Sequence, residues 1–215
     1  MRIRFELLLV LVVSATATAD EIADARQRWE TSPHGPMLER ILPPTFEAAQ
    51  LPERDSRGAK LVLGYCVQCH NLANPAMHHA GKWPGIVRRM VLRMQGKGNM
   101  GTLMAEMMAG VKAPNEADTG AIIEYLSRHG QTPLDPARYP ELNRPSGEAF
   151  RLACNQCHVL PDPQRHTAQE WRAVVARMQE NMEWMNRVVG SKPMPGEPRL
   201  AVEEINAFLA KYARR

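Results

Sequence analysis

The chain has 215 residues, of which 44% are hydrophobic and 6% aromatic, and its formal net charge is +4. This length is sufficient for two small domains. The 27 lysines and arginines are spread along the chain without a basic run. With so few aromatic residues, the composition does not indicate a nucleic-acid-binding surface. A modest basic excess is compatible with simple solubility or with attraction of an acidic protein partner.

Residues 1–19 have the pattern of a secretory signal peptide. Arg2 and Arg4 precede an aliphatic run at 7–13, and Ala17–Ala19 supplies the small residues of a cleavage site. The run is shorter than the about 20 residues of a transmembrane helix, and no later stretch reaches that length. We therefore expect a mature chain that begins at Asp20, is exported to the periplasm and has no stable membrane span. Its charge falls to about +3 because two arginines and one glutamate leave with the signal.

All four cysteines fall in two copies of the pattern Cys-x-x-Cys-His, at 66–70 and 154–158. The pattern is typical of covalent haem attachment, because two thiols on one turn each bond a vinyl group of the same porphyrin and the histidine binds the iron. A thioredoxin-like dithiol or half of a zinc site uses Cys-x-x-Cys without the trailing histidine. The sequence therefore predicts two covalently bound haem c groups, held by Cys66, Cys69 and His70 and by Cys154, Cys157 and His158.

The two motifs lie inside a longer internal repeat. A shift of 88 residues aligns about thirty positions without a gap. The aligned positions include Trp83 and Trp171, each of which follows its motif histidine by thirteen residues. Self-similarity of this kind indicates one structural module used twice.

Prolines between the two copies mark a domain boundary. Residues 131–145 contain four prolines, which interrupt helices and favour an extended linker. The linker separates a first domain at 56–130 from a second domain at 146–215. An N-terminal extension at 20–55 has no counterpart in the second half, and we expect a short helix at 21–30 within it. The rest of the extension is expected to wrap on the surface or dock on a partner.

Both domains show helical periodicity and no strand-like alternation, so the sequence predicts an all-α fold. In each copy we expect a leading helix before the motif, a second helix that starts near the tryptophan, and a closing helix. A haem supplies much of the apolar surface that such a small core needs. The expected ranges are 58–65, 82–95 and 118–128 in the first copy and 146–153, 168–182 and 202–212 in the second.

These features resemble the class I c-type cytochromes, which share the leading helix, the Cys-x-x-Cys-His turn and a closing helix of the Ile-Ile-Glu-Tyr-Leu kind. The resemblance covers nearly all of residues 56–215. The pattern Trp-x3-Val-x-Arg-Met, at 83–90 and 171–178, is similar to the haem-domain pattern of the cytochrome subunit of quinohemoprotein amine dehydrogenases. The resemblance implies two tandem cytochrome c-like helical domains, each with a distal methionine ligand seven residues after the tryptophan, at Met90 and Met178.

The sequence contains thirteen methionines, and several of them are candidates for the sixth iron ligand. Met90 and Met178, the pair that the resemblance implies, occupy equivalent positions of the repeat. Met94 and Met182 also occupy equivalent positions, one helical turn later, and are therefore direct alternatives for the same ligand role. Met100 and Met194 are further distal alternatives, and Met194 lies in a Pro-Met-Pro loop that the first copy lacks. The choice matters because Met/His ligation raises the reduction potential relative to bis-histidine ligation and closes the iron to substrates.

Other residues that match across the repeat have candidate roles beside a haem. The matched arginines are either propionate partners or exposed helical residues, and the matched histidines are propionate partners, distal ligands or plain surface residues. The tryptophans are expected to pack on the porphyrin or beneath the closing helix. The pairs are Arg89 and Arg177, His78 and His166, and Trp83 and Trp171.

Two classes of function fit these observations. The first is a periplasmic dihaem c-type cytochrome that transfers electrons between redox protein partners, such as a periplasmic dehydrogenase and a terminal reductase or oxidase. The second is a dihaem oxidoreductase, peroxidase-like or acting on a small sulfur or nitrogen compound, with one open haem iron. Two near-identical motifs and no identifiable acid/base pair favour the carrier, so we expect no catalytic residues.

Overall fold

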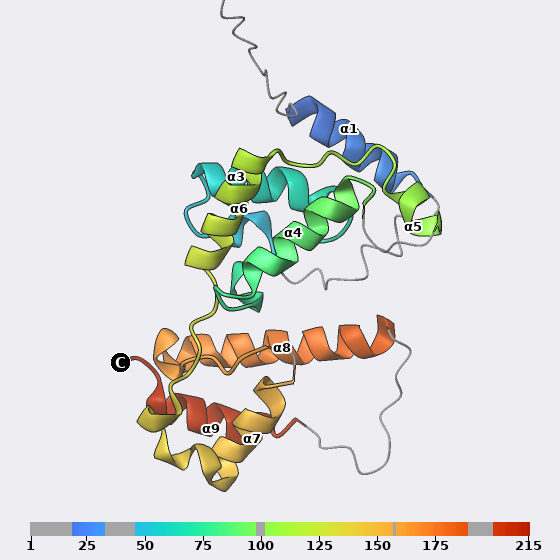
Figure 1. Cartoon of the computed structure of the whole chain (residues 1–215). Helices are drawn as coiled ribbons and strands as arrows, with labels where there is room; N and C mark the ends of the chain where they lie inside the picture. Colours follow the sequence, from blue (N-terminus) through green and yellow to red (C-terminus); the bar gives the residue numbers. More distant parts are fainter. Residues whose placement is uncertain (1–18, 33–45, 98–101, 157, 189–199) are drawn as a thin grey trace, which may run out of the picture.

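The computed structural model describes residues 19–32, 46–97, 102–156, 158–188 and 200–215 (Figure 1). Regular structure in these ranges is helical, and no strand occurs among them, which confirms the all-α prediction. No helix in the described ranges is long and apolar enough to cross a membrane. The expected signal peptide lies outside them.

The first copy of the repeat is built on three helices. They are α3 (Arg57–Tyr65), α4 (Trp83–Met94) and α6 (Glu116–Arg128), each within two residues of its expected range. A short helix, α5 (Thr102–Met107), comes between α4 and α6 along the chain. Helix α6 packs against both α3 and α4. Their shared core includes Val62, Tyr65, Trp83, Val87, Ile122, Tyr125 and Leu126.

The second copy repeats this arrangement. Its helices are α7 (Pro145–Cys154), α8 (Ala168–Val188) and α9 (Val202–Tyr212), and α9 packs against both α7 and α8. The closing helices bury apolar residues at the same spacing in both copies. Ile205, Phe208 and Leu209 of α9 are spaced like Ile122, Tyr125 and Leu126 of α6. Phe150 of α7 stacks on Phe208, with 5.0 Å between ring centroids.

Helix α8 runs six residues beyond its expected end at 182, whereas α4 ends where its sequence predicts. A glycine cap explains the difference. Gly96 adopts a positive φ of 67°, its amide donates to Arg93 O at 2.9 Å, and the amide of Lys97 donates to Leu92 O at 2.8 Å. This pair of hydrogen bonds is the Schellman motif that ends helices. The repeat places Trp184 where the first copy has this glycine, so α8 continues.

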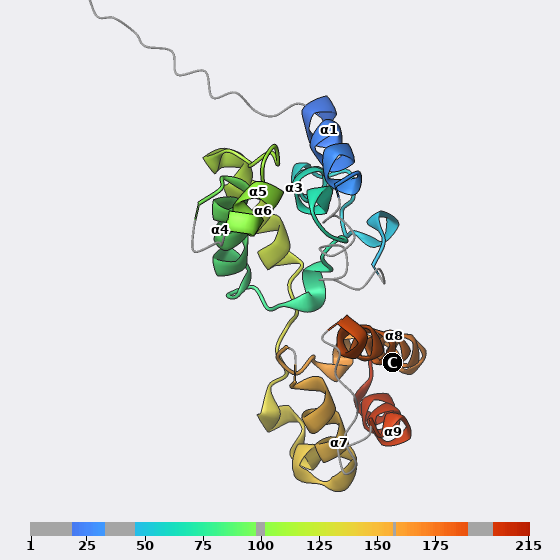
Figure 2. The ribbon, with the colours of Figure 1, turned by 90° about the vertical axis from the view of Figure 1, so that its right-hand side faces the viewer.

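The N-terminal extension begins with α1 (Ala19–Glu30), which confirms the expected helix at 21–30. This helix packs against α3 and against the 3-10 turn at Cys66–Gln68 (Figure 2). Ala25 and Trp29 are its buried apolar residues. The start of the extension therefore lies directly against the first Cys-x-x-Cys-His motif.

The segment between the copies differs from the expected extended linker. It contains two 3-10 turns, Pro136–Arg138 and Pro140–Asn143, each with a proline at its first position. Proline is favoured there because an amide N–H in the first turn of a helix has no acceptor within the helix. Proline, which lacks this hydrogen, therefore loses no hydrogen bond. Leu134, Tyr139 and Leu142 are buried in the core of the second copy. Much of the linker thus belongs structurally to the second copy.

A close helix crossing generates the first testable prediction. A Cβ atom at Gly58 of α3 would lie 2.4 Å from Cβ of Tyr125 on α6, which is closer than atoms can approach. We expect Gly58→Ala to lower the free energy of unfolding by about 1–3 kcal/mol because the two helices must move apart.

The matched control is Gly120→Ala on the exposed side of α6, where the added Cβ meets nothing within 4 Å. This change should leave stability unchanged or raise it by up to about 1 kcal/mol, since alanine is the better helix former. Denaturant unfolding of the purified protein measures both variants. Equal losses at the two positions would contradict the close crossing.

Candidate haem sites

The structure places both motifs where the leading helix ends. In the first copy α3 stops at Tyr65, and Cys66 begins a 3-10 turn that leads to Cys69 and His70. In the second copy α7 runs through Cys154, and His158 follows shortly after its end. Cys157 lies outside the described residues. Cys66, Cys69 and Cys154 form no disulfide.

The described motif cysteines lie in apolar surroundings. Burial raises the pKa of Cys66 to about 12, with a smaller contribution from the neighbouring Cys69, and raises the pKa of Cys69 to about 11. Burial likewise raises the pKa of Cys154 to about 12. Reactive dithiols have the opposite property, because their function requires a thiolate stabilised by cationic neighbours. These thiols are therefore protonated at neutral pH.

The two motif histidines make the same hydrogen bond. Nδ1 of His70 lies 2.8 Å from the carbonyl oxygen of Asn71, and Nδ1 of His158 lies 2.9 Å from that of Val159. A carbonyl oxygen can only accept a hydrogen bond, so Nδ1 carries the proton in each ring. The lone pair is then on Nε2, as a metal-binding histidine with a bonded second nitrogen requires. Both rings thus fit an axial ligand of haem iron.

Each motif is followed by a buried tryptophan held in the same way. The indole Nε1–H of Trp83 donates to the carbonyl oxygen of Pro75 at 2.9 Å, and that of Trp171 donates to Pro163 at 2.6 Å. In both copies this carbonyl belongs to a short 3-10 turn that follows the motif. The hydrogen bond fixes the chain between the motif and the second helix. The duplication seen in the sequence therefore extends to side-chain geometry.

The matched histidines after each motif pack on these tryptophans. His78 meets Trp83 edge to face, with 5.2 Å between ring centroids, and His166 meets Trp171 at 4.8 Å. Burial, with Lys82 nearby, lowers the pKa of His78 to about 4, so its ring is neutral at neutral pH. Burial also lowers the pKa of His166. Packing on the tryptophan of the same copy is thus a contact that both rings share.

Several buried side-chain nitrogen atoms lack a hydrogen-bond partner among the described residues. They include Nδ1 of His78, Nε of Arg177 and Nε1 of Trp29. Buried polar groups normally have partners, and each unsatisfied one has a free-energy cost. Acceptor oxygens such as haem propionates would satisfy the N–H donors of Arg177 and Trp29, and Nδ1 of His78 in the tautomer that carries its proton there, so these atoms are compatible with a bound haem. Arg89, the repeat partner of Arg177, is exposed.

A separate apolar cluster includes Cys69 of the first motif. It joins Trp29 of α1 to Cys69, Met108 and Val111, and Met94 of α4 packs against it. No sequence pattern assigns a role to Trp29, because the extension has no repeat partner and a single tryptophan carries no motif. The structure thus shows that the surroundings of the first motif include a residue from outside the repeat.

The candidate distal methionines differ in their surroundings. Met90, Met94, Met178 and Met182 are all partly buried on the second helices, so the structure retains each as a candidate. Met94 packs against the described apolar cluster that contains the motif cysteine Cys69. Met178 Sδ accepts a weak hydrogen bond from Asn181 Nδ2 at 3.9 Å. Met100 and Met194 lie outside the described residues.

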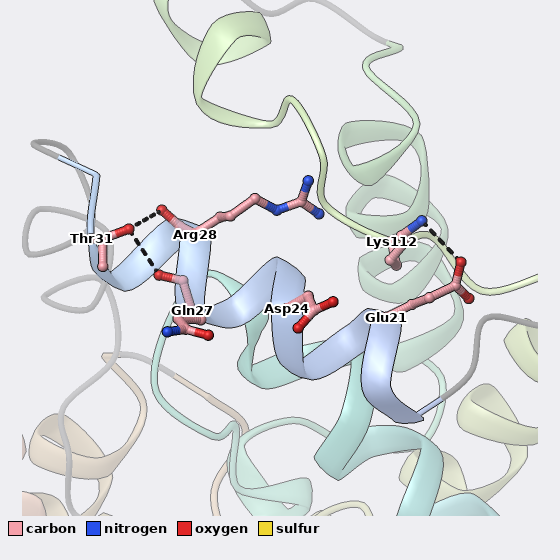
Figure 3. Close-up of a pocket in the computed structure, with 6 residues that line it drawn as sticks. All are labelled: Glu21, Asp24, Gln27, Arg28, Thr31 and Lys112. Atoms are coloured by element: carbon pink, nitrogen blue, oxygen red, sulfur yellow. Dashed lines mark hydrogen bonds and ion pairs between the residues drawn. The ribbon is translucent and has the colours of Figure 1, made fainter.

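A polar pocket of about 530 Å³ lies between α1 and the backbone near Lys112 (Figure 3). Lys112 Nζ lies 3.5 Å from a carboxylate oxygen of Glu21, and Arg28 Nη2 donates to the carbonyl oxygen of Gly110 at 3.0 Å. These contacts fasten α1 to the first copy. The pocket contains no motif cysteine or histidine, and its lining is Glu21, Asp24, Gln27, Arg28, Thr31 and Lys112.

Gln68 and Gln156 occupy the same motif position but have different surroundings. Gln68 is buried, its Nε2 donates to Lys112 O at 2.8 Å, and its Oε1 accepts from Lys112 N at 2.8 Å. Gln156 is exposed and donates to Leu152 O within its own turn at 3.1 Å. The first motif is thereby tied to the segment before α6, whereas among the described residues the hydrogen bond of the second glutamine is local.

No family model, curated protein or solved structure matches the chain. The assignment of these sites therefore depends on the motif, the repeat and the geometry described above.

The two glutamines provide a matched pair of variants. We expect Gln68→Ala to lower the free energy of unfolding by about 2 kcal/mol, because it leaves the backbone amide and carbonyl of Lys112 without partners in a partly buried position. Gln156→Ala should change it by less than about 0.5 kcal/mol, as is usual at exposed positions. Denaturant titration followed by far-ultraviolet circular dichroism compares the two. Similar losses would show that the bonds to Lys112 contribute little.

Proposed function

We propose that this protein is a periplasmic dihaem c-type cytochrome that transfers electrons between redox protein partners. The observation that carries the proposal is the twofold occurrence of Cys-x-x-Cys-His at the end of a leading helix, with the histidine Nδ1–H bonded to the next carbonyl oxygen. The signal-like residues 1–19 support export, and covalent haem attachment of this kind resembles a process that bacteria carry out outside the cytoplasm.

Two tandem cytochrome c-like domains are part of this proposal. In each copy the closing helix packs on both the leading and the second helix, and the same tryptophan hydrogen bond recurs beside each motif. The interpretation that one domain was duplicated explains both the ungapped repeat and these shared contacts.

The residues present fit two haem groups. In the first copy Cys66 and Cys69 are the attachment thiols and His70 Nε2 is the axial nitrogen, and the second copy offers Cys154, Cys157 and His158 in the same roles. A bound haem supplies reversible one-electron chemistry at its iron. The chain's own contribution is to hold each imidazole in one tautomer and one orientation.

Haem content tests the proposal directly. We expect the mature exported protein to have the mass of the chain from Asp20 plus two haems, measured by intact-protein mass spectrometry. A Cys66→Ala/Cys69→Ala double variant should lose one haem, and a Cys154→Ala/Cys157→Ala variant should lose the other. Met77→Leu, outside both motifs, serves as the control that keeps two. A wild-type mass without haem would overturn the proposal.

Optical spectroscopy separates a carrier from an oxidoreductase. If methionine closes both irons, both haems of the oxidised protein show the weak absorption band near the red end of the spectrum, and the reduced protein ignores carbon monoxide. We expect Met90→Leu to remove the band of one haem and Met94→Leu to preserve it, because Met90 matches the repeat and the family pattern. Carbon monoxide uptake by one haem of the unmodified protein would favour the oxidoreductase instead.

A further inference from the structure

Gln131, the first residue of the linker, is a buried polar side chain at the junction between the two copies. It is 5% exposed, and its backbone amide donates to the carbonyl oxygen of His78 at 2.9 Å. Its side-chain Nε2 donates to the carbonyl oxygen of Val159 at 2.8 Å. The residue therefore connects the segment after the first motif to the residue that directly follows the second motif.

The oxygen that Gln131 contacts is the one that holds the second motif histidine. Val159 O accepts from His158 Nδ1 at 2.9 Å and from Gln131 Nε2 at 2.8 Å, so two donors converge on one carbonyl. The orientation of the amide follows from chemistry, because turning it over would place Oε1 against another acceptor oxygen. Oε1 is buried and has no hydrogen-bond partner among the described residues, so the side chain makes its contact through the donor end.

The linker does not need this side-chain bond to stay in place. Residues 79 and 131 form a parallel backbone bridge, and residues 133 and 161 form an antiparallel one. The amide of Leu134 also donates to the carbonyl oxygen of Leu160 at 2.7 Å. The backbone of the linker is thus bonded to the first copy at residues 78 and 79 and to the second copy at residues 160 and 161, directly after Val159. The side chain of Gln131 adds a separate hydrogen bond to the Val159 carbonyl.

We propose that Gln131 is a positioning residue for the second axial histidine, acting through the carbonyl of Val159 to fix the His158 ring and to raise the reduction potential of the second haem. The inference rests on the proposed dihaem function. A carbonyl oxygen that accepts two hydrogen bonds shares its electron density between them, so each bond is weaker than it would be alone. A weaker Nδ1–H bond leaves the imidazole a poorer electron donor to iron, which disfavours the oxidised state.

The test replaces Gln131 by leucine, which keeps most of the side-chain volume and removes the donor. The matched control is Arg165→Ala, because Arg165 Nη1 donates across the same junction to Gly130 O at 3.3 Å and does not use the Val159 carbonyl. Both variants are studied as full-length exported protein. A redox titration monitored by nuclear magnetic resonance follows each iron through resonances of its own histidine ring.

We expect Gln131→Leu to shift the second couple to lower potential and to leave the first unchanged. At a fixed solution potential near the midpoint, the ratio of oxidised to reduced second haem should rise about threefold to tenfold, where tenfold corresponds to about 59 mV for one electron. The His158 Nδ1–H resonance of the reduced protein should move downfield as its hydrogen bond strengthens. Arg165→Ala should show neither change.

Unchanged potentials, equal shifts of both couples, or the same shift in Arg165→Ala would each overturn the inference. If the leucine variant does not fold, Gln131→Met provides a second donor-free side chain of similar length, to be judged by the same criteria. Haem content of the unmodified protein is measured first. A protein without two haems refutes the proposed function itself, and that result is distinct from two attached haems whose potentials ignore residue 131.

Discussion

The hydrogen bond from Nδ1–H of each motif histidine to the next carbonyl oxygen is the interaction on which both candidate sites depend. It selects the tautomer with its lone pair on Nε2, and it sets the direction in which the ring projects from the end of the leading helix. The donor and acceptor belong to adjacent residues, so a few residues of sequence suffice to specify it. The same geometry could therefore be duplicated with the motif.

The rest of each copy holds the chain in place on both sides of this bond. On one side the leading helix packs against the closing helix, and Gly58 allows α3 and α6 to approach closely. On the other side the indole of Trp83, or of Trp171 in the second copy, bonds a proline carbonyl and anchors the start of the second helix. The buried tryptophan connects the histidine segment to the core, since its ring packs with the closing helix residues.

Local patterns explain why most of the fold, but only part of the site, was predictable from sequence. Helix positions follow from periodicity and from the repeat, and α4, α6 and α9 lie within two residues of expectation. The longer α8 depends on the absence of the glycine cap that ends α4, which is a single-residue difference. The surroundings of Trp29 and Gln131 could not be predicted, because they join segments about forty and twenty-eight residues apart and neither position belongs to the repeat.

Contacts from outside the repeat distinguish the two copies, and this has a consequence for an electron carrier. Duplicated haem sites begin with equal environments, so a preferred direction of electron flow requires some feature that makes their potentials unequal. In this chain Trp29 belongs to the apolar cluster that contains Cys69 of the first copy, and Gln131 donates to the carbonyl that binds His158 in the second. In the proposed carrier the N-terminal extension and the linker would therefore supply the asymmetry, while the repeated residues would supply the attachment chemistry that the two sites share.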